Sequence, residues 1–234
     1  MKISVIIPAY NEEENLGKTL DAILSSDYPN FEVIVADNAS TDKTSAIAAA
    51  KGAKVIYEKR KGTSSAREAG RKVASGKILA FLDADCLPEK DWLSRGAKHF
   101  DDHRVVAVTG PYDYYDGPIF FRWFSLNSQK YIWRPVNSIV RVFNRGMLIE
   151  GNMFIRASTL ETVGGFDVLI TFYGDGTDTA KRLAPHGQIV FDKNLVLKTS
   201  ARRFKREGTI KITAEYIFHF FRTAFFLKMR RKKN

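Results

Sequence analysis

Residues 3–37 read ISVIIPAYNEEENLGKTLDAILSSDYPNFEVIVAD, and their apolar pattern changes twice along the way. Residues 3–8 and 32–37 are short apolar runs rich in Val and Ile, which is typical of buried strands. The amphipathic stretch between them, residues 12–25, reads as a helix. A strand, a helix and a second strand in this order predict a βαβ unit with parallel strands.

The same alternation continues through the first hundred residues. Residues 53–58 and 77–83 read as further buried strands, and residues 41–50 and 64–74 read as helices. This pattern predicts an α/β fold with a mostly parallel sheet covered by helices on both faces. In such sheets ligands bind beyond the carboxyl ends of the strands.

Polar side chains follow three of the predicted strands. Residues 10–11 (Tyr-Asn) follow the first strand, residues 37–38 (Asp-Asn) end the second, and Asp83 and Asp85 end the fourth. Residues two apart in a strand share a face, so we expect Asp83 and Asp85 to project together. Capping would explain one such pair, but three strands that deliver polar groups to one edge favour a ligand site.

The chain lacks the usual glycine motifs of phosphate binding. It has no G-x-G-x-x-G after the first strand, no G-x-x-x-x-G-K-[ST] and no G-x-S-x-G. Its single cysteine, Cys86, excludes an intramolecular disulfide and a Cys-based zinc cluster, and indicates a reducing compartment. Acids at a sheet edge without a glycine-rich loop suggest that a metal ion carries the ligand's phosphates.

The formal net charge of +11 is concentrated near the C-terminus. Residues 198–234 carry 12 of the 37 Lys and Arg but two of the 26 Asp and Glu, which leaves 25 basic and 24 acidic residues elsewhere. A nearly neutral body argues against nucleic-acid binding. Residues 209–234, Phe-rich with one narrow polar stripe and a KMRRKKN end, predict an amphipathic helical tail on an anionic membrane surface. A core or dimer helix with a basic end is the alternative.

A second aromatic segment lies between two prolines. Residues 118–135 read PIFFRWFSLNSQKYIWRP, with arginine and lysine interleaved among the aromatic residues. A buried helix would produce this stripe. A helix in contact with a membrane or an acceptor would produce it as well, and both interpretations remain open.

Five segments of the chain occur in one known combination: SVIIPAYNEEENLGKTLDAILSSDYPNFEVIVADNASTDKT (4–44), GTSSAREAG (62–70), AFLDADC (80–86), EGNMFIRASTLETVGGFD (150–167) and FYGDGTDTAKRL (172–183). Together they resemble the family 2 glycosyltransferases of the GT-A fold. The resemblance implies a GT-A domain over residues 1–208, with a Rossmann-like nucleotide-binding half (1–100) and an acceptor-side half (101–208). Residues 209–234 form the tail beyond it.

The resemblance also implies an activity. Family members transfer a sugar from a nucleotide-diphosphate donor, here a UDP- or GDP-sugar, to an acceptor hydroxyl, usually with inversion and with Mg²⁺ or Mn²⁺. Together with the tail, this predicts a cytoplasmic enzyme, peripheral on the cytoplasmic face of the cell membrane, that acts on a lipid-linked acceptor or a cell-envelope polysaccharide. A catalytically decayed nucleotide-sugar-binding or scaffolding module is the alternative.

Residue by residue, the resemblance assigns a donor site. Asp37 would bond the base, and Arg67 would lie over the base or near the diphosphate. Asp83 would contact the ribose and the metal, and Asp85 would be the direct metal ligand. The other residues expected at the donor are Pro8, Ala9, Tyr10 and Glu12 around the base and ribose, Gly151 and Asn152 on the sugar side, and Arg202 and Arg203 near the diphosphate. A solvated basic loop is the alternative role for the two arginines.

The expected catalytic base falls at a departure from the family pattern. Members carry G-E-D-x-D-L-x-x-R-L with the second acid as base, and residues 174–183 of this chain read GDGTDTAKRL. Read without a gap, the base position is Gly176, and Asp175 replaces the glutamate. We expect Asp175 to act as the base, with Asp178 as second choice. A cap on the following helix is the alternative role for Asp178.

Overall fold

The computed structural model describes residues 1–142, 147–170 and 174–222, so the basic end of the predicted tail lies outside the described residues. Seven strands form the central sheet in the order β3-β2-β1-β4-β8-β6-β9. β8 runs antiparallel to both of its neighbours, and the other strands share one direction. The predicted α/β fold with a mostly parallel sheet is therefore confirmed. The strands are β1 Ile3–Ala9, β2 Phe31–Asp37, β3 Lys54–Tyr57, β4 Ile78–Leu82, β6 Val105–Thr109, β8 Asn152–Arg156 and β9 Gln188–Phe191.

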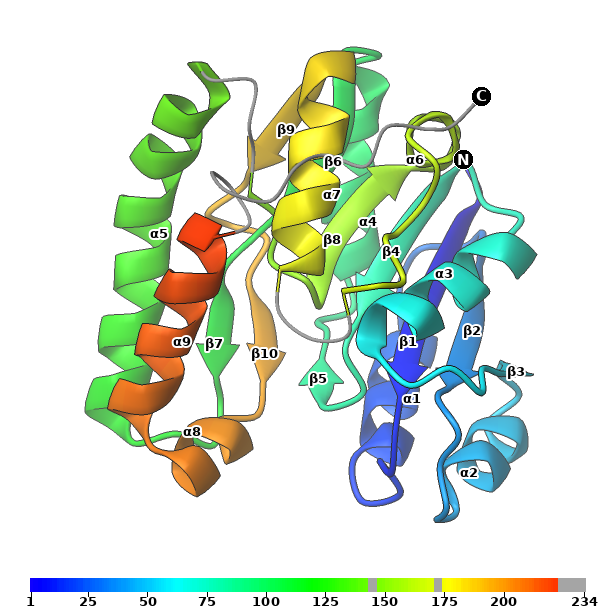
Figure 1. Ribbon diagram of the computed structural model, residues 1–234. Coiled ribbons are helices and arrows are strands. Elements are labelled where there is room, and N and C mark those ends of the chain that lie inside the picture. The colour runs from blue at the N-terminus through cyan, green and yellow to red at the C-terminus, as the bar shows by residue number, and fades with distance from the viewer. Residues whose placement is uncertain (143–146, 171–173, 223–234) are drawn as a thin grey trace.

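Helices cover both faces of this sheet (Figure 1). Alternate residues of β1 point to opposite faces: Ile3, Val5 and Ile7 share one buried cluster, and Ile6 belongs to another. The first cluster includes side chains of α1, α2 and α4, and the second includes those of α6 and α7. α3 lies against Ile6 and thus on the second face. The helices are α1 Leu16–Leu24, α2 Thr44–Ala50, α3 Thr63–Val73, α4 Trp92–Lys98, α6 Ala157–Thr162 and α7 Asp175–Leu183, with single 3₁₀ turns at His99–Asp101 and Ala184–His186.

A second, smaller sheet in the order β5-β10-β7 stands beside the carboxyl end of β4. Three helices accompany it, and the side chain of Phe204 joins them. Its ring centroid lies 5.0 Å from that of Tyr114, 5.1 Å from Phe121 and 6.3 Å from Tyr216. The elements of this part are β5 Cys86–Leu87, β7 Tyr112–Tyr114, β10 Leu197–Thr199, α5 Ile119–Val142, α8 Arg202–Glu207 and α9 Thr209–Phe221.

The first helix is shorter than the sequence pattern predicted. α1 begins at Leu16 rather than at residue 12. The backbone N–H of Glu12 donates to Thr44 Oγ1 at 2.8 Å, and that of Glu13 donates to Asp42 Oδ2 at 3.0 Å. Because these groups bond to the neighbouring loop, the loops after β1 and β2 are tied together at the carboxyl edge of the sheet.

We expect the fold to lose stability at low pH when Glu32, at the start of β2, becomes protonated. Burial alone would raise its pKa, but hydrogen bonds from Ser4 and Ser75, with Lys2 nearby, lower it to about 2. A lowered pKa stabilises the ionised native state above the unfolded pKa, and this stability is lost as pH falls through the folded value. In urea unfolding, Glu32→Gln should therefore lose about 2 kcal/mol at pH 7. The deficit should shrink between pH 5 and pH 2, whereas a deficit independent of pH would contradict this explanation. Glu14→Gln, at an exposed position, is the control.

Candidate active site

Two acids lie directly beyond the central strand β4. The strand ends at Leu82, one residue before the predicted end at Asp83, so Asp83 and Asp85 both stand in the turn to β5. The N–H of Cys86 donates to the Asp83 carbonyl at 3.2 Å and closes this turn. Both carboxylates are partly buried, with 35% and 14% of the side chains exposed. The turn therefore holds two acids close together at the sheet edge.

Asp85 is crowded by other carboxylates, and this changes its pKa. Burial, together with the nearby carboxylates of Asp83 and Glu12, raises the pKa of Asp85 to about 6. The guanidinium of Arg202 opposes this effect. Its Nε donates to Asp85 Oδ2 at 3.0 Å, and its Nη2 donates to Glu12. Arg202 thus supplies positive charge where acids from two loops converge.

The acids fit a cation that is shared with a ligand. Within residues 1–142, 147–170 and 174–222, no cluster of three or more His, Cys, Asp or Glu side chains could hold a metal ion by itself. Mg²⁺ and related ions need one or two carboxylates when phosphate oxygens and water complete the coordination. Asp83 and Asp85 provide that number, and their mutual repulsion would fall with a cation between them.

The ends of β1 and β2 form the adjoining part of the edge. Ala9 pairs in register with Asp37, and Pro8 precedes it in β1. Tyr10 is half-exposed, and the Lys61 ammonium lies 3.6 Å from its ring centroid. This edge therefore offers an accessible aromatic face and a cation beside the two acids, a combination suited to an aromatic base with attached phosphates.

Asp37 shapes the loop after β2. Its side chain is buried, and its carboxylate accepts the Ser40 N–H at 3.0 Å and the Ser45 hydroxyl at 2.5 Å. Nearby, Asn11 and Ala39 have φ values of 52° and 59°, which non-glycine residues rarely adopt. Such backbone persists when the surrounding structure fixes it, and it clusters at functional sites. The contact of Asp37 with a base stays a prediction.

A buried arginine joins three carboxylates beside these acids. Arg67 of α3 is 1% exposed, and its guanidinium donates to Asp83 Oδ1 at 2.9 Å and to Asp175 Oδ2 at 2.5 Å. Glu150 Oε2 lies 3.8 Å from Arg67 Nη1. Arg67 therefore connects the turn after β4 to the start of α7.

The carboxyl groups of Glu150 and Asp175 lie against each other. Burial and the charge of Asp175 raise the pKa of Glu150 well above its ordinary value. Burial opposes ionisation of Asp175 as well, but Arg67 and hydrogen bonds hold the pKa of Asp175 below its usual range. Glu150 Oε1 also accepts the N–H groups of Gly174 and Gly176, at 3.1 and 3.3 Å, beside the N-terminus of α7.

Gly151 brings backbone directly against one of the acids. A Cβ atom at this position would lie 2.1 Å from Asp83 Oδ2 and 2.4 Å from Tyr112 Oη. The Tyr112 hydroxyl donates to the same carboxylate oxygen at 3.2 Å. A side chain at position 151 would displace Asp83, so the geometry requires glycine here.

The sequence of this chain matches known proteins. The family model "Glycosyl transferase family 2" matches residues 4–164. The chain belongs to glycosyltransferase family 2. Glycosyltransferase AglE of Haloferax volcanii is 35% identical to this family 2 member over 184 residues, which cover 74% of this chain and 58% of AglE. A glucosyltransferase of Escherichia coli, WfaP, is 39% identical over 87 residues, which cover 36% of this chain and 35% of WfaP.

Solved structures agree on the fold of this family 2 member. The mannosyltransferase PcManGT of Pyrobaculum calidifontis superposes with a TM-score of 0.68 at 24% identity, over 92% of this chain and 64% of that one. Glucosyl-3-phosphoglycerate synthase of Mycobacterium tuberculosis gives a TM-score of 0.66 at 21% identity, over 97% and 80%. The predicted GT-A fold is therefore confirmed, and this chain spans less than two thirds of the length of AglE and PcManGT.

In this family 2 member, neither predicted base presents a free carboxylate to the edge. Asp175 is 3% exposed, and its oxygens accept hydrogen bonds from Arg67 and the N–H of Gly176. Asp178 accepts a hydrogen bond from Arg182 Nε at 2.8 Å one helical turn later. Arg182 in turn donates to backbone carbonyls of residues 163 and 165. The capping role that the sequence left open for Asp178 was wrong, because the N-cap of α7 is Gly174, which makes no side-chain cap bond, and Asp178 lies inside the helix. Asp178 instead pairs with Arg182 along the helix.

Two other predicted residues have partners within the fold. Asn152 is fully buried, accepts the Trp92 indole N–H at 3.0 Å, and donates to the carbonyls of Pro111 and Leu195. Its amide is committed to these bonds within the core, and the place of Asn152 on the sugar side stays a prediction. Arg203 pairs with Glu207 and Glu215, at 3.5 and 4.0 Å, and so faces α9 instead of the acids.

Sequence reasoning missed Glu150 and Tyr112. They come together through the antiparallel insertion of β8 between β4 and β6. One signal was present for Glu150, since it opens the family segment at residues 150–167. Tyr112 carried none, because it is one of three tyrosines in the stretch YDYY and nothing local distinguishes it from the others.

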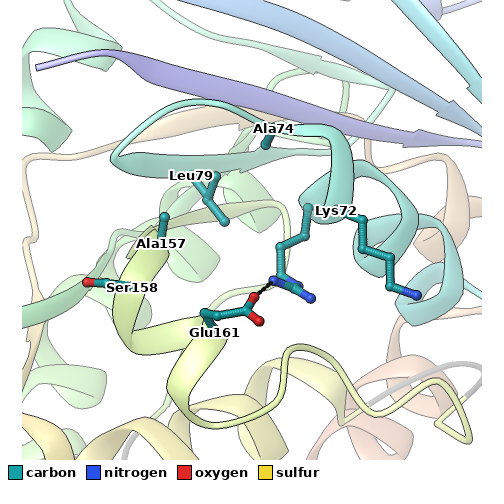
Figure 2. Close-up of a pocket in the computed structure, with 7 residues that line it drawn as sticks. Lys72, Ala74, Leu79, Ala157, Ser158 and Glu161 are labelled. Atoms are coloured by element: carbon teal, nitrogen blue, oxygen red, sulfur yellow. Dashed lines mark hydrogen bonds and ion pairs between the residues drawn. The ribbon is translucent and has the colours of Figure 1, made fainter.

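A pocket of about 470 Å³ lies on another part of the molecule (Figure 2). Arg71, Lys72 and Glu161 are among its lining residues, and Arg71 bonds Glu161 within it. It contains none of the predicted site residues. The candidate active site is thus the carboxyl edge of the sheet, and this pocket is separate from it.

Proposed function

We propose that the chain is a metal-dependent, inverting glycosyltransferase that moves a sugar from a nucleotide-diphosphate sugar to an acceptor hydroxyl at a membrane surface. The observation that carries this proposal is the pair of acids, Asp83 and Asp85, held at the carboxyl edge beside Arg67 and Arg202. The solved relatives support the choice of donor. PcManGT is described with GDP-Man and Mn²⁺, and the M. tuberculosis synthase with UDP and Mn²⁺.

Asp83 and Asp85 would hold the metal and thereby the donor's diphosphate. Bound there, Mg²⁺ or Mn²⁺ would neutralise charge on the departing nucleoside diphosphate. Asp85 is paired with Arg202 in the structure, so the guanidinium must leave that oxygen before a metal binds it. Once released, Arg202 is placed to donate to phosphate oxygens, for which its forked N–H groups are suited.

The nucleotide would lie along the ends of β1 and β2. Tyr10 offers its face to the base, and Asp37 lies at the end of the adjacent strand. Pro8, Ala9 and Glu12 would border the base and ribose from the same segment. Lys61, which lies over the Tyr10 ring and donates to the carbonyls of Asn38 and Ala39, would add positive charge beside the nucleotide.

A thermal-shift series with nucleotides tests the donor class. UDP, GDP and ADP, each with and without Mn²⁺, should give different shifts in Tm. A ligand that binds only the native state and is present at 100 times its Kd stabilises that state by about 2.7 kcal/mol. We expect UDP or GDP with Mn²⁺ to raise Tm by several degrees and ADP to do little. No shift with any nucleotide, or equal shifts with all three, would contradict a specific nucleotide-sugar site.

The acceptor side carries an aromatic surface. Phe120, Trp123 and Phe124 of α5 are 75%, 62% and 58% exposed, and Phe218 of α9 is 63% exposed. No helix in the described ranges is both long and apolar enough to cross a membrane. Exposed aromatic side chains on helices with basic neighbours suit the headgroup region of a bilayer. The E. coli relative is named for a diphosphoundecaprenol-linked acceptor, which supports a lipid-linked acceptor here.

Vesicle sedimentation tests this membrane surface. We expect the protein to bind vesicles of phosphatidylglycerol and phosphatidylcholine, and Trp123→Ser with Phe124→Ser to weaken binding by about tenfold or more. The two rings account for this loss, because burying one large apolar side chain contributes about 1.5–3 kcal/mol. Tyr57→Ser, at an exposed aromatic residue of β3, is the matched control. Binding that the double variant leaves intact would contradict the role of α5.

A further inference from the structure

The three carboxylates around Arg67 differ in how open they are. Asp175 is 3% exposed and saturated by its hydrogen bonds, whereas the side chains of Asp83 and Glu150 are 35% and 31% exposed. Asp83 belongs to the acid pair that would hold the metal. Glu150 is therefore the carboxylate of this cluster that can face an acceptor while leaving the metal site intact.

Glu150 also fills the space beside the glycine of α7. A Cβ at Gly176 would lie 2.8 Å from Glu150 Cγ and 2.7 Å from the carbonyl oxygen of Leu148. A side chain at position 176 and the Glu150 side chain would thus compete for one volume. Because residue 176 has no side chain, the carboxyl group of Glu150 occupies this place beside the N-terminus of α7.

The backbone next to Glu150 fixes its distance from the donor side. Gly151, the following residue, lies in contact range of Asp83 and Tyr112, as the close approach at its missing Cβ shows. Glu150 Oε1 is anchored by the N–H groups of Gly174 and Gly176. Glu150 is therefore held by two backbone N–H groups, and the residue that follows it in the chain contacts Asp83.

We propose that Glu150, rather than Asp175 or Asp178, takes the proton of the acceptor hydroxyl. This inference rests on the proposed function. The acceptor oxygen attacks the anomeric carbon with a lone pair and forms the new C–O bond. The anomeric C–O bond to the diphosphate breaks, and its electron pair leaves with the diphosphate. The hydroxyl proton passes to the Glu150 carboxylate and then to water as products depart.

The surroundings of Glu150 suit this role. Burial, and after it the charge of Asp175 and a hydrogen bond with that carboxylate, raise the pKa of Glu150 well above its ordinary value, while Arg67 lowers it. A carboxylate with a raised pKa is a stronger proton acceptor once ionised. Asp175 acts as a positioning residue in this arrangement, because it holds Arg67 and the start of α7.

The test is the pair Glu150→Gln and Asp175→Asn, measured for turnover of UDP- and GDP-sugars with Mn²⁺ and, separately, for binding of the nucleotide by calorimetry. General-base removal typically costs about 10²–10⁴ in rate. We expect that loss in kcat for Glu150→Gln, with nucleotide Kd within about threefold of the original. We expect Asp175→Asn to lower Tm and nucleotide affinity together. Glu89→Gln, an exposed glutamate outside the cluster, should behave as the unmodified protein.

Each other outcome overturns the assignment in a recognisable way. Turnover by Glu150→Gln within threefold of the original would show that another group takes the proton. A parallel loss of nucleotide binding and turnover would show that Glu150 only supports the site. If the unmodified protein neither binds a nucleotide nor turns over any donor, the proposed function fails first and the assignment fails with it.

Discussion

Arg67→Met should lower the free energy of unfolding by about 3–5 kcal/mol and abolish turnover. Removing one partner of a buried ion pair leaves uncompensated charge, and breaking such pairs costs about this much. Here the loss is shared by Asp83, Asp175 and Glu150, which would repel one another without the guanidinium between them. Urea unfolding followed by circular dichroism measures the stability change.

Arg71→Met provides a matched control on the same helix. Arg71 lies one turn after Arg67 and pairs with Glu68 and with Glu161, whose side chain is 71% exposed. Because solvent can take over part of these contacts, we expect a loss of about 1 kcal/mol. Equal losses in the two variants would show that the carboxylate cluster has no special role in stability.

A double variant separates the cluster from simple loss of packing. Combining Arg67→Met with Asp175→Asn removes one of the repelling carboxylates. Interaction energies between contacting residues are typically about 0.5–3 kcal/mol. The combined loss should therefore be smaller than the sum of the single losses by such an amount, and strict additivity would argue against direct coupling of the two residues.

The second large effect is expected at Asp85. Asp85→Asn should reduce metal-dependent nucleotide binding by about 100-fold or more while the fold remains intact. The carboxylate supplies a charged oxygen ligand, and an amide of the same shape does not compensate the cation's charge. The substitution also relieves the repulsion of Asp85 by Asp83 and Glu12, so Tm without metal should stay the same or rise.

Calorimetric titration of UDP and GDP in the presence and absence of Mn²⁺ measures this effect. Metal should improve nucleotide affinity in the unmodified protein and leave Asp85→Asn unchanged. A control variant, Asp91→Asn, removes an acid elsewhere on the surface that is also paired with an arginine, although its side chain is 52% exposed against 14% for Asp85. If Asp85→Asn keeps the full response to Mn²⁺, Asp85 is not a metal ligand.

The fold could be predicted from the sequence wherever local pattern and tertiary environment agree. β1, β2 and the helix between them are a continuous βαβ unit, and their apolar periodicity survives in the core. The acids after β4 were placed correctly at the sheet edge, although the strand ends at Leu82. The hydrophobicity of the sequence does not change sharply between a strand and the turn that follows it, so the last residue of β4 could not be predicted from the sequence.

The remaining parts of the site depend on contacts between distant segments. Asn152 follows a glycine, as a loop residue would, yet it begins β8 and is buried against Trp92. Asp175 looks like a free acid in a glycine-rich stretch, yet Arg67, 108 residues away, holds it inside. No local pattern encodes these pairings, because they follow from the order of strands in the sheet.

Release of free nucleoside diphosphate from UDP- and GDP-sugars tests the central claim most directly. Water can serve as acceptor, so the assay does not require the natural one. The account predicts release from at least one donor by the unmodified protein with Mn²⁺, no release after chelation with EDTA, and none by Asp85→Asn. Release that continues unchanged in EDTA or in Asp85→Asn, or its absence with every donor, would contradict a metal-dependent glycosyltransferase.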